Sequence, residues 1–263
     1  MINFSKSKII NYPYPILIVD NFFEDKYLNH LLSQFPKYKD FIKYKKVMGN
    51  RRFLSNDNPN FFKYIDNNKY WLKFYQEINS KKFYKKILKK LVHQDLQLKK
   101  NLSRLKFNND FNKKNKFIFN LSFYLKEFAK LIPKNKFFNK IKIMIKYIFY
   151  EKKNDDCYLR FDLSAASNEY YREPHCDSDG TILAFLIYLE DQKNIGGNGG
   201  NFIIHRKNKV IFKSIKPKKN TAVFFLSNKN SIHSVSKITN ATGWRKFIYG
   251  GYTSKNKYIN LKM

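Results

Sequence analysis

Two histidines and one aspartate have a spacing that could hold a metal ion. His175 and Asp177 are two residues apart, and His233 follows 56 residues after Asp177. On an extended segment, side chains two residues apart point to the same face, so His175 and Asp177 can chelate one ion. Two imidazoles and one carboxylate leave three adjacent positions of an octahedral ion open. This ligand set is typical of Fe(II) centres that react with dioxygen.

Other assignments of these residues remain open. A single histidine is more often a surface or core residue than a ligand, so the prediction depends on the three residues together. His205 is an alternative third ligand, although it lies only 28 residues after Asp177. Cys176 would point away from its neighbours on a strand, and we interpret it as a packing residue. The same ligands could also hold Zn or Mn.

The elements that position these residues are expected to be short strands. From about residue 156 onward, turns such as 196–200 and 207–209 separate segments rich in Val, Ile, Phe and Tyr. The expected strands are 157–163, 181–189, 202–205, 210–215, 222–226, 233–237 and 246–252. Many short strands at this spacing predict a double-stranded β-helix, also called a jelly roll.

The N-terminal part of the chain is expected to be mostly helical. We expect a strand at 15–19, then a helix with Asn21 as its N-cap that ends before Pro36. Residues 59–153 read mostly as helices, one of them capped by Ser80. Residues 81–153 contain 22 Lys or Arg and only 4 Asp or Glu. This Lys-rich segment could be a helical insertion or a lid.

The predicted fold class is therefore α+β, with a jelly-roll core and N-terminal and inserted helices. Residues 156–263 would form the catalytic core, and residues 1–155 a supporting region of strand and helices. We expect the two parts to form one integrated domain.

The bulk composition predicts a soluble protein. Hydrophobic residues make up 43% of the 263 residues, and no stretch reaches the roughly 20 apolar residues of a membrane span. We expect no secretory signal. Two cysteines give no disulfide framework, so a reducing cytoplasmic location is expected, where iron would stay ferrous.

The formal net charge of +32 has two interpretations. It could serve a polyanionic partner such as nucleic acid or an anionic membrane surface. It could also follow from compositional drift, because Lys, Asn, Ile, Phe and Tyr are enriched together. Charge alone does not decide between them. The alternative to an enzyme is thus a non-enzymatic basic protein that binds a polyanion or nucleic acid.

Taken together, the motifs resemble those of the Fe(II)/2-oxoglutarate-dependent dioxygenases, in the prolyl-hydroxylase-like branch. The resemblance covers roughly residues 156–253 and follows the order that the family uses. The matching features are His175-x-Asp177, the strand around Tyr188-Leu189-Glu190, the turn Gly199-Gly200-Asn201-Phe202, the run from Ile215 to Phe225, His233 and Arg245. The opening from Tyr14 to Phe23 is also similar to the usual start of these proteins.

The resemblance implies Fe(II), 2-oxoglutarate and O2 as cofactor and cosubstrates. His175, Asp177 and His233 would bind the metal, and Arg245 would grip the far carboxylate of 2-oxoglutarate. The hydroxyl of Tyr188 could bond the same carboxylate, or Tyr188 could be barrel core. No catalytic residue beyond the metal ligands is predicted.

The implied reaction is hydroxylation with release of succinate and CO2, and desaturation or demethylation are alternatives. Asp177 argues against halogenating relatives, in which a small residue leaves room for halide. A base-repair role is in doubt because Lys246-Phe247-Ile248-Tyr249 after Arg245 departs from that branch's pattern.

The substrate itself is unknown; a small molecule, a glycan precursor and a protein side chain are the candidates, and an anionic substrate is one possibility. Residues that could contact it are Arg160, Asp162, Tyr170, Tyr171 and Arg172.

Overall fold

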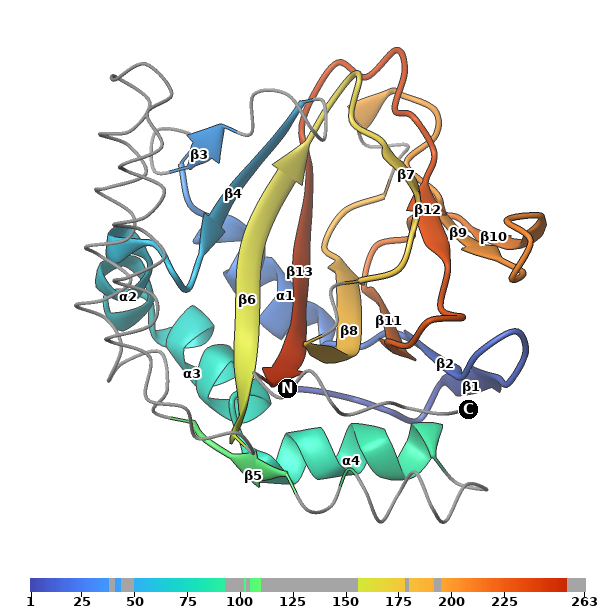
Figure 1. The fold of residues 1–263 in the computed structure, drawn as a ribbon. Helices are drawn as coiled ribbons and strands as arrows, with labels where there is room; N and C mark the ends of the chain where they lie inside the picture. Colours follow the sequence, from blue (N-terminus) through green and yellow to red (C-terminus); the bar gives the residue numbers. More distant parts are fainter. Residues whose placement is uncertain are drawn as a thin grey trace, which may run out of the picture.

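A computed structural model describes residues 1–37, 41–43, 50–92, 102, 105–109, 156–177, 180–191 and 195–254 (Figure 1). Most of the Lys-rich segment 81–153 lies outside them, and so does the expectation that it forms an insertion or a lid.

Two antiparallel sheets face each other. In the large sheet the strand order is β1 (Ser7–Ile10), β2 (Ile16–Asp20), β11 (Thr221–Leu226), β8 (Thr181–Tyr188), β13 (Arg245–Ser254), β6 (Asp156–Ala166), β4 (Arg51–Ser55) and β3 (Ile42–Lys43). The short β5 (Lys106–Phe107) pairs with β6 in parallel. In the small sheet the order is β10 (Ile211–Ile215), β9 (Phe202–His205), β12 (His233–Val235) and β7 (Arg172–His175).

From β6 to β13 the chain passes repeatedly between the two sheets. β6, β8, β11 and β13 belong to the large sheet, whereas β7, β9, β10 and β12 belong to the small one (Figure 1). This alternation is the path of a jelly roll. The α+β class with a jelly-roll core, predicted from the spacing of strands and turns, is confirmed.

The large sheet is covered on both faces, which explains why its central strands β8 and β11 are almost continuously apolar. Along β8, Leu183, Phe185 and Ile187 belong to one hydrophobic cluster, and Ala184, Leu186 and Tyr188 belong to another. Successive side chains on a strand point to opposite faces, so one strand serves two cores. The first cluster packs against helices, and the second fills the space between the two sheets.

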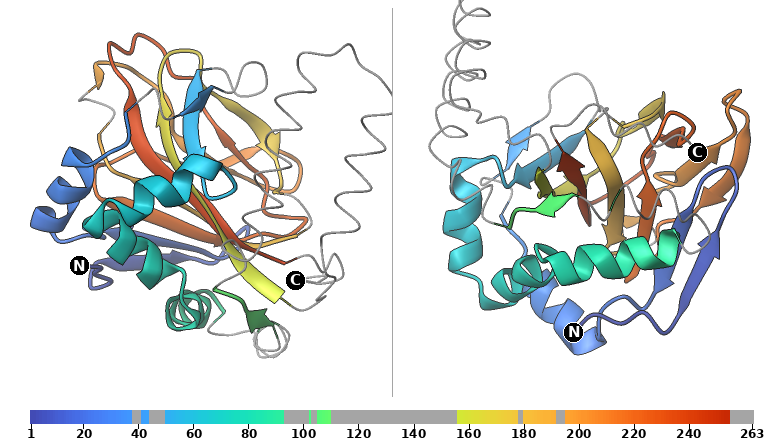
Figure 2. Two further views of the ribbon diagram at one scale, coloured as in Figure 1. Left: turned by 90° about the vertical axis from the view of Figure 1, so that its left-hand side faces the viewer. Right: turned by 60° about the horizontal axis from the view of Figure 1, so that its bottom comes forward.

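Four helices of the described residues cover the outer face of the large sheet: α1 (Asp25–Ser33), α2 (Pro59–Asp66), α3 (Lys69–Ile78) and α4 (Lys81–Leu91) (Figures 1 and 2). Trp71 of α3 is fully buried and donates a hydrogen bond from Nε1 to the carbonyl of Leu31 in α1, at 3.1 Å. The predicted cap of α4 is present, since the Ser80 hydroxyl accepts from the amide of Phe83. None of these helices has the length and apolar character needed to cross a membrane.

The predicted start of the first helix was wrong. α1 begins at Asp25, and Asn21 instead has a left-handed backbone conformation, with φ of 52°, directly after β2. The intervening amide of Phe23 donates to the Asn220 side chain at 2.7 Å. Because a tertiary contact takes this amide, the helix begins later than the local sequence pattern indicated.

The N-terminal half contributes strands that the sequence did not reveal. β1, β3 and β4 were not predicted, and β4 has no clean alternation of polar and apolar residues. β4 nevertheless pairs with β6 from Arg51 opposite Ala166 to Ser55 opposite Asp162. β2 pairs with β11 at the other side of the same sheet. The two halves of the chain therefore share the large sheet, and both contribute to each of its two hydrophobic clusters.

Asn220 ties the turn before β11 to the segment before α1. Its side chain accepts from the Phe23 amide at 2.7 Å and donates to the Phe23 carbonyl at 2.8 Å, and both residues are buried. Asn220→Ala should lower the free energy of unfolding by about 2 to 4 kcal/mol, because two buried backbone groups lose their partner. Urea denaturation measures the change.

Asn240→Ala is the matched control for this prediction. Both residues have a left-handed backbone conformation, with φ of 64° at Asn220 and 58° at Asn240, but Asn240 is exposed. It should lose only the left-handed preference of asparagine, about 1 kcal/mol. Equal losses in the two variants would show that the paired bonds to Phe23 do not stabilise the fold.

Candidate metal centre

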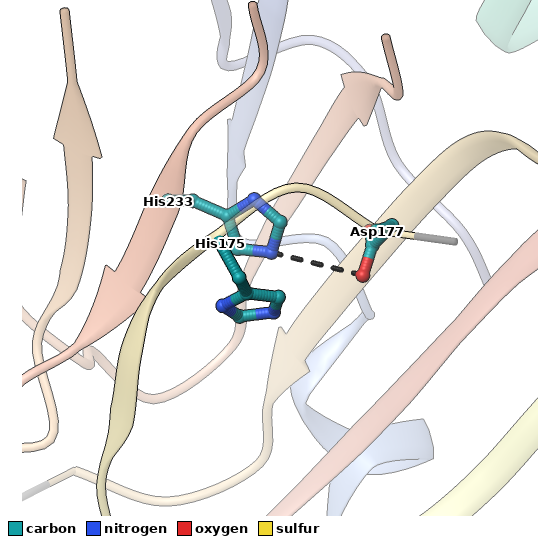
Figure 3. Close-up of side chains that lie close together, drawn as sticks. All are labelled: His175, Asp177 and His233. Atoms are coloured by element: carbon teal, nitrogen blue, oxygen red, sulfur yellow. Dashed lines mark ion pairs between the residues drawn. The ribbon is translucent and has the colours of Figure 1, made fainter. Parts of the chain in front are cut away.

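His175, Asp177 and His233 come together at one end of the small sheet. His175 is the last residue of β7, His233 is the first of β12, and the two are directly paired in the antiparallel register. Asp177 follows two residues after the end of β7. One potential ligand atom from each residue lies within 4.8 Å of the others, and Figure 3 shows the three side chains converging.

Backbone carbonyls fix the orientation of both imidazoles. Nδ1 of His175 lies 2.7 Å from the carbonyl of Glu173, and Nδ1 of His233 lies 2.9 Å from the carbonyl of Ser231. A carbonyl can only accept, so Nδ1 of each ring carries the proton and Nε2 keeps its lone pair. This arrangement is common around metal-binding histidines, because it sets the tautomer before the ion arrives.

Burial keeps these imidazoles neutral. It lowers the pKa of His233 from 6.5 to about 4, and it also lowers the pKa of His175. Because a metal ion needs the neutral imidazole, both side chains are in the binding form at neutral pH.

The carboxylate of Asp177 completes a donor set that fits a divalent cation. Its Oδ1 lies 3.8 Å from Nε2 of His233 (Figure 3). The same oxygen accepts a hydrogen bond from the Tyr249 hydroxyl at 3.1 Å. Its Oδ2 is buried and has no hydrogen-bond partner among the described residues. A buried carboxylate oxygen without a partner is costly, and a bound cation would offset that cost.

The alternative third ligand, His205, and the neighbouring Cys176 lie outside this group. His205 is buried in β9, where its Nδ1 bonds the carbonyl of Lys209 and its Nε2 bonds the Ser234 hydroxyl. Cys176 follows the end of β7, so the alternation expected of a strand does not extend to it. It lines the cavity edge, and its thiol donates to the carbonyl of Lys229 at 3.4 Å.

The three residues open onto a cavity of about 210 Å³. The cavity lies on the inner side of the jelly roll, and its wall combines aromatic and cationic side chains. It is lined by Arg51, Arg160, Tyr170, Arg172, His175, Cys176, Asp177, Thr181, Leu186, Phe202, Phe225, His233, Val235 and Tyr249.

Arg245 lies deeper in the same barrel and is only 1% exposed. Its guanidinium carbon is 5.6 Å from the centre of the Tyr188 ring, and Nη1 donates to the carbonyl of Gly200 at 3.3 Å. Burial lowers the pKa of Arg245. Neither Arg245 nor Tyr188 is part of the cavity wall. Arg245, which was predicted to bind the far carboxylate of 2-oxoglutarate, therefore lies behind the wall and inside the core.

Tyr188 is buried beside Arg245 and has a protonated hydroxyl. Burial raises its pKa to about 12, and its ring packs against the guanidinium. The structure thus brings the two residues predicted to contact the cosubstrate next to each other.

The Gly-Gly turn makes room for this guanidinium. Gly200 has φ of 68°, and a Cβ at this position would lie 2.1 Å from Nη1 of Arg245. A residue with a side chain would therefore be strained in its backbone and would displace the arginine.

Three of the five predicted substrate contacts, Arg160, Tyr170 and Arg172, line the cavity. The other two do not. Asp162 is fully buried and forms ion pairs with Arg51 and Arg160. Tyr171 is 38% exposed and is not part of the cavity wall.

The sequence reasoning missed Tyr249 and Arg51. Tyr249 could have been found, because Arg245, Phe247 and Tyr249 alternate along β13 and must share one face. Arg51 gave no signal, since its strand was not predicted.

Part of the chain matches a known protein family. Residues 161–254 match the 2OG-Fe(II) oxygenase superfamily, and this segment contains the three converging residues and Arg245. The match covers 94 of the 263 residues and agrees with the resemblance seen in the sequence. The family implies Fe(II) and 2-oxoglutarate.

The solved structures that resemble this chain include prolyl 4-hydroxylases. A Pseudomonas putida prolyl-4-hydroxylase matches with a TM-score of 0.51 and 11% identity, over 91% of this chain and 92% of the other. A prolyl 4-hydroxylase from Phytophthora capsici matches with a TM-score of 0.52 and 11% identity, over 91% of this chain and 59% of the other. At this identity the likeness shows the fold. A search of curated protein sequences finds no match.

Gly200→Ala should weaken 2-oxoglutarate binding by about tenfold or more, equivalent to about 1.4 kcal/mol, because the added methyl displaces Arg245. The dissociation constant can be measured by calorimetry in the absence of oxygen. Gly243→Ala is the control, since a Cβ there meets Ile195 at an ordinary distance of 3.6 Å. Unchanged affinity in Gly200→Ala would contradict the placement of Arg245 at the cosubstrate.

The lowered pKa of His233 predicts how stability depends on pH without metal. The unfolded chain takes up a proton below pH 6.5, whereas the folded protein does so only near pH 4. The free energy of unfolding should therefore fall as the pH falls through this window, by about 1 kcal/mol per pH unit from this residue.

This pH effect can be isolated with His233→Gln. Urea denaturation in the presence of a chelator should show a steeper loss for the wild type than for the variant between pH 6.5 and 4.5. Above pH 7.5 the difference between the two proteins should be constant. Parallel curves throughout would mean that His233 is not held neutral by burial.

Proposed function

We propose that this protein is an Fe(II)- and 2-oxoglutarate-dependent hydroxylase. His175, Asp177 and His233 would hold the iron, and Arg245 would bind the far carboxylate of 2-oxoglutarate. The observation that carries the proposal is the convergence of two neutral imidazoles and one buried carboxylate, with one potential ligand atom of each within 4.8 Å of the others. The match of residues 161–254 to the 2OG-Fe(II) oxygenase superfamily supports it.

Fe(II) and 2-oxoglutarate, when bound, supply the oxidising chemistry that places an oxygen atom from O2 on a substrate carbon and releases succinate and CO2. The chain's own residues prepare the site for that chemistry. The carbonyls of Glu173 and Ser231 hold the imidazole rings in place, and Tyr249 fixes the orientation of the Asp177 carboxylate. A preset ligand geometry reduces the cost of binding the ion.

Arg245 is suited to a carboxylate partner. A guanidinium can donate two parallel hydrogen bonds to a carboxylate, which a lysine ammonium cannot do. Its surroundings of Tyr188 and Phe247 are apolar, and a charge pair is stronger where water is excluded. The protonated hydroxyl of Tyr188 could donate to the same carboxylate.

Hydroxylation is the outcome we propose, rather than halogenation, because Asp177 fills the position that a halide would need. The candidate substrates are a small molecule, a glycan precursor or a protein side chain. A cavity of about 210 Å³ beside the metal ligands suits a group of side-chain size. The likeness in fold to prolyl 4-hydroxylases supports the last of these candidates.

Anaerobic titration with Fe(II) and 2-oxoglutarate tests the proposal. Wild-type protein should develop the weak visible charge-transfer band of a 2-oxoglutarate chelate on Fe(II), and His233→Ala should not. His205→Ala is the matched control, because His205 is a buried histidine on the neighbouring strand with both ring nitrogens bonded to protein. It should keep the band.

Two outcomes would contradict the proposal. Folded wild-type protein with ferrous iron and no band would mean that the pair does not bind. A band lost in His205→Ala and kept in His233→Ala would exchange the two histidines' roles. Competition with Zn(II) and Mn(II), which the same ligands could hold, shows whether iron is preferred.

A further inference from the structure

Three arginines line the cavity beside the metal-binding residues, and they differ in their acidic partners. Arg51 and Arg160 both donate to the same oxygen of Asp162, at 3.2 and 3.1 Å. The Arg51 side chain is buried, whereas that of Arg160 is 50% exposed. One carboxylate therefore serves two guanidinium groups.

Arg172 is the third, and it has no acidic partner among the described residues. The one hydrogen bond of its side chain to these residues runs from Nη2 to Nε2 of His175, at 3.1 Å. Nδ1 of His175 carries the ring proton, since it donates to the carbonyl of Glu173. Nε2 thus has a single lone pair, and Arg172 occupies it.

The same lone pair is needed by the metal. An imidazole nitrogen that binds a cation cannot also accept a hydrogen bond from a guanidinium. Metal binding must therefore release Arg172 from His175. Arg172 stays attached to β7 three residues before His175, so the released guanidinium remains beside the cavity.

We propose that Arg172, assisted by Arg160, binds a carboxylate or phosphate group of the substrate. The inference rests on the proposed function and deepens it by naming the substrate class. A guanidinium next to the metal site without an acidic partner matches a planar or tetrahedral oxyanion. An anion held there would place the rest of the substrate in the cavity, next to the metal ligands.

This site is distinct from that of the cosubstrate. Arg245 lies inside the barrel against Gly200 and Tyr188, whereas Arg172 and Arg160 belong to the cavity wall. Two separate cationic positions allow two anionic molecules to be held at once. Arg51 is less suited to the substrate, because it is buried and bonds both Asp162 and Ser164.

Calorimetry on the anaerobic complex of protein, Fe(II) and saturating 2-oxoglutarate tests the proposal. The probes are inorganic phosphate and acetate, titrated separately, and the tighter probe indicates whether the substrate carries a phosphate or a carboxylate. At least one should bind the wild type, and Arg172→Gln should weaken that binding by about tenfold or more, equivalent to about 1.4 kcal/mol. Arg160→Gln should produce a smaller loss.

Arg206→Gln is the matched control. Arg206 is exposed in the turn after β9 and packs on the Phe212 ring, away from the cavity wall. It should bind the probe as the wild type does. The charge-transfer band of each variant shows that it is folded and loaded.

The results separate this inference from the proposed function. If the band forms but neither probe binds, or if Arg172→Gln binds the probe as tightly as wild type, the inference is wrong and the proposed function stands. If Arg172→Gln weakens 2-oxoglutarate instead of the probe, Arg172 belongs to the cosubstrate, and the inference is also wrong. If the wild type forms no band, the proposed function fails and the inference with it.

Discussion

The antiparallel pairing of β7 with β12 is the constraint on which the site depends. It sets His233 directly opposite His175, although 57 residues separate them in sequence, and it leaves Asp177 just beyond the strand end. A register shift of one residue would turn one of the imidazoles to the other face of the sheet. The pairing is held in turn by β9 on the other side of β12 and by the packing of the small sheet against the large one.

The second constraint is that one sheet serves two cores. Helices cover the outer face of the large sheet, and the side chains of its inner face contribute to the site. Along β13, inward positions hold Arg245, Phe247 and Tyr249, which link the deep guanidinium to the Asp177 carboxylate. Polar groups are tolerated in this core because they bond one another or lie against aromatic rings.

The jelly roll and the three converging residues could be predicted from the sequence, because both depend on local patterns: short apolar strands, glycine turns and the two-residue spacing of His175 and Asp177. The start of α1 could not be predicted, since a distant side chain, Asn220, takes the amide of Phe23. Arg51 was missed for the same kind of reason: its strand is recognised by its pairing with β6 and β3, which lie far from it in sequence or have no strand pattern of their own. The contact between Arg172 and His175 required the structure, because the residue spacing alone gives no distance between the two side chains.

X-ray absorption at the iron edge tests the central claim most directly, using the anaerobic complex with Fe(II) and 2-oxoglutarate. The claim is that His175, Asp177 and His233 are the protein's only ligands to the metal. It predicts a first shell of nitrogen and oxygen only, including the outer-ring scattering of two imidazoles. A sulfur neighbour at about 2.3 Å, the distance of a metal–thiolate bond, would show that Cys176 is a ligand and would contradict the claim.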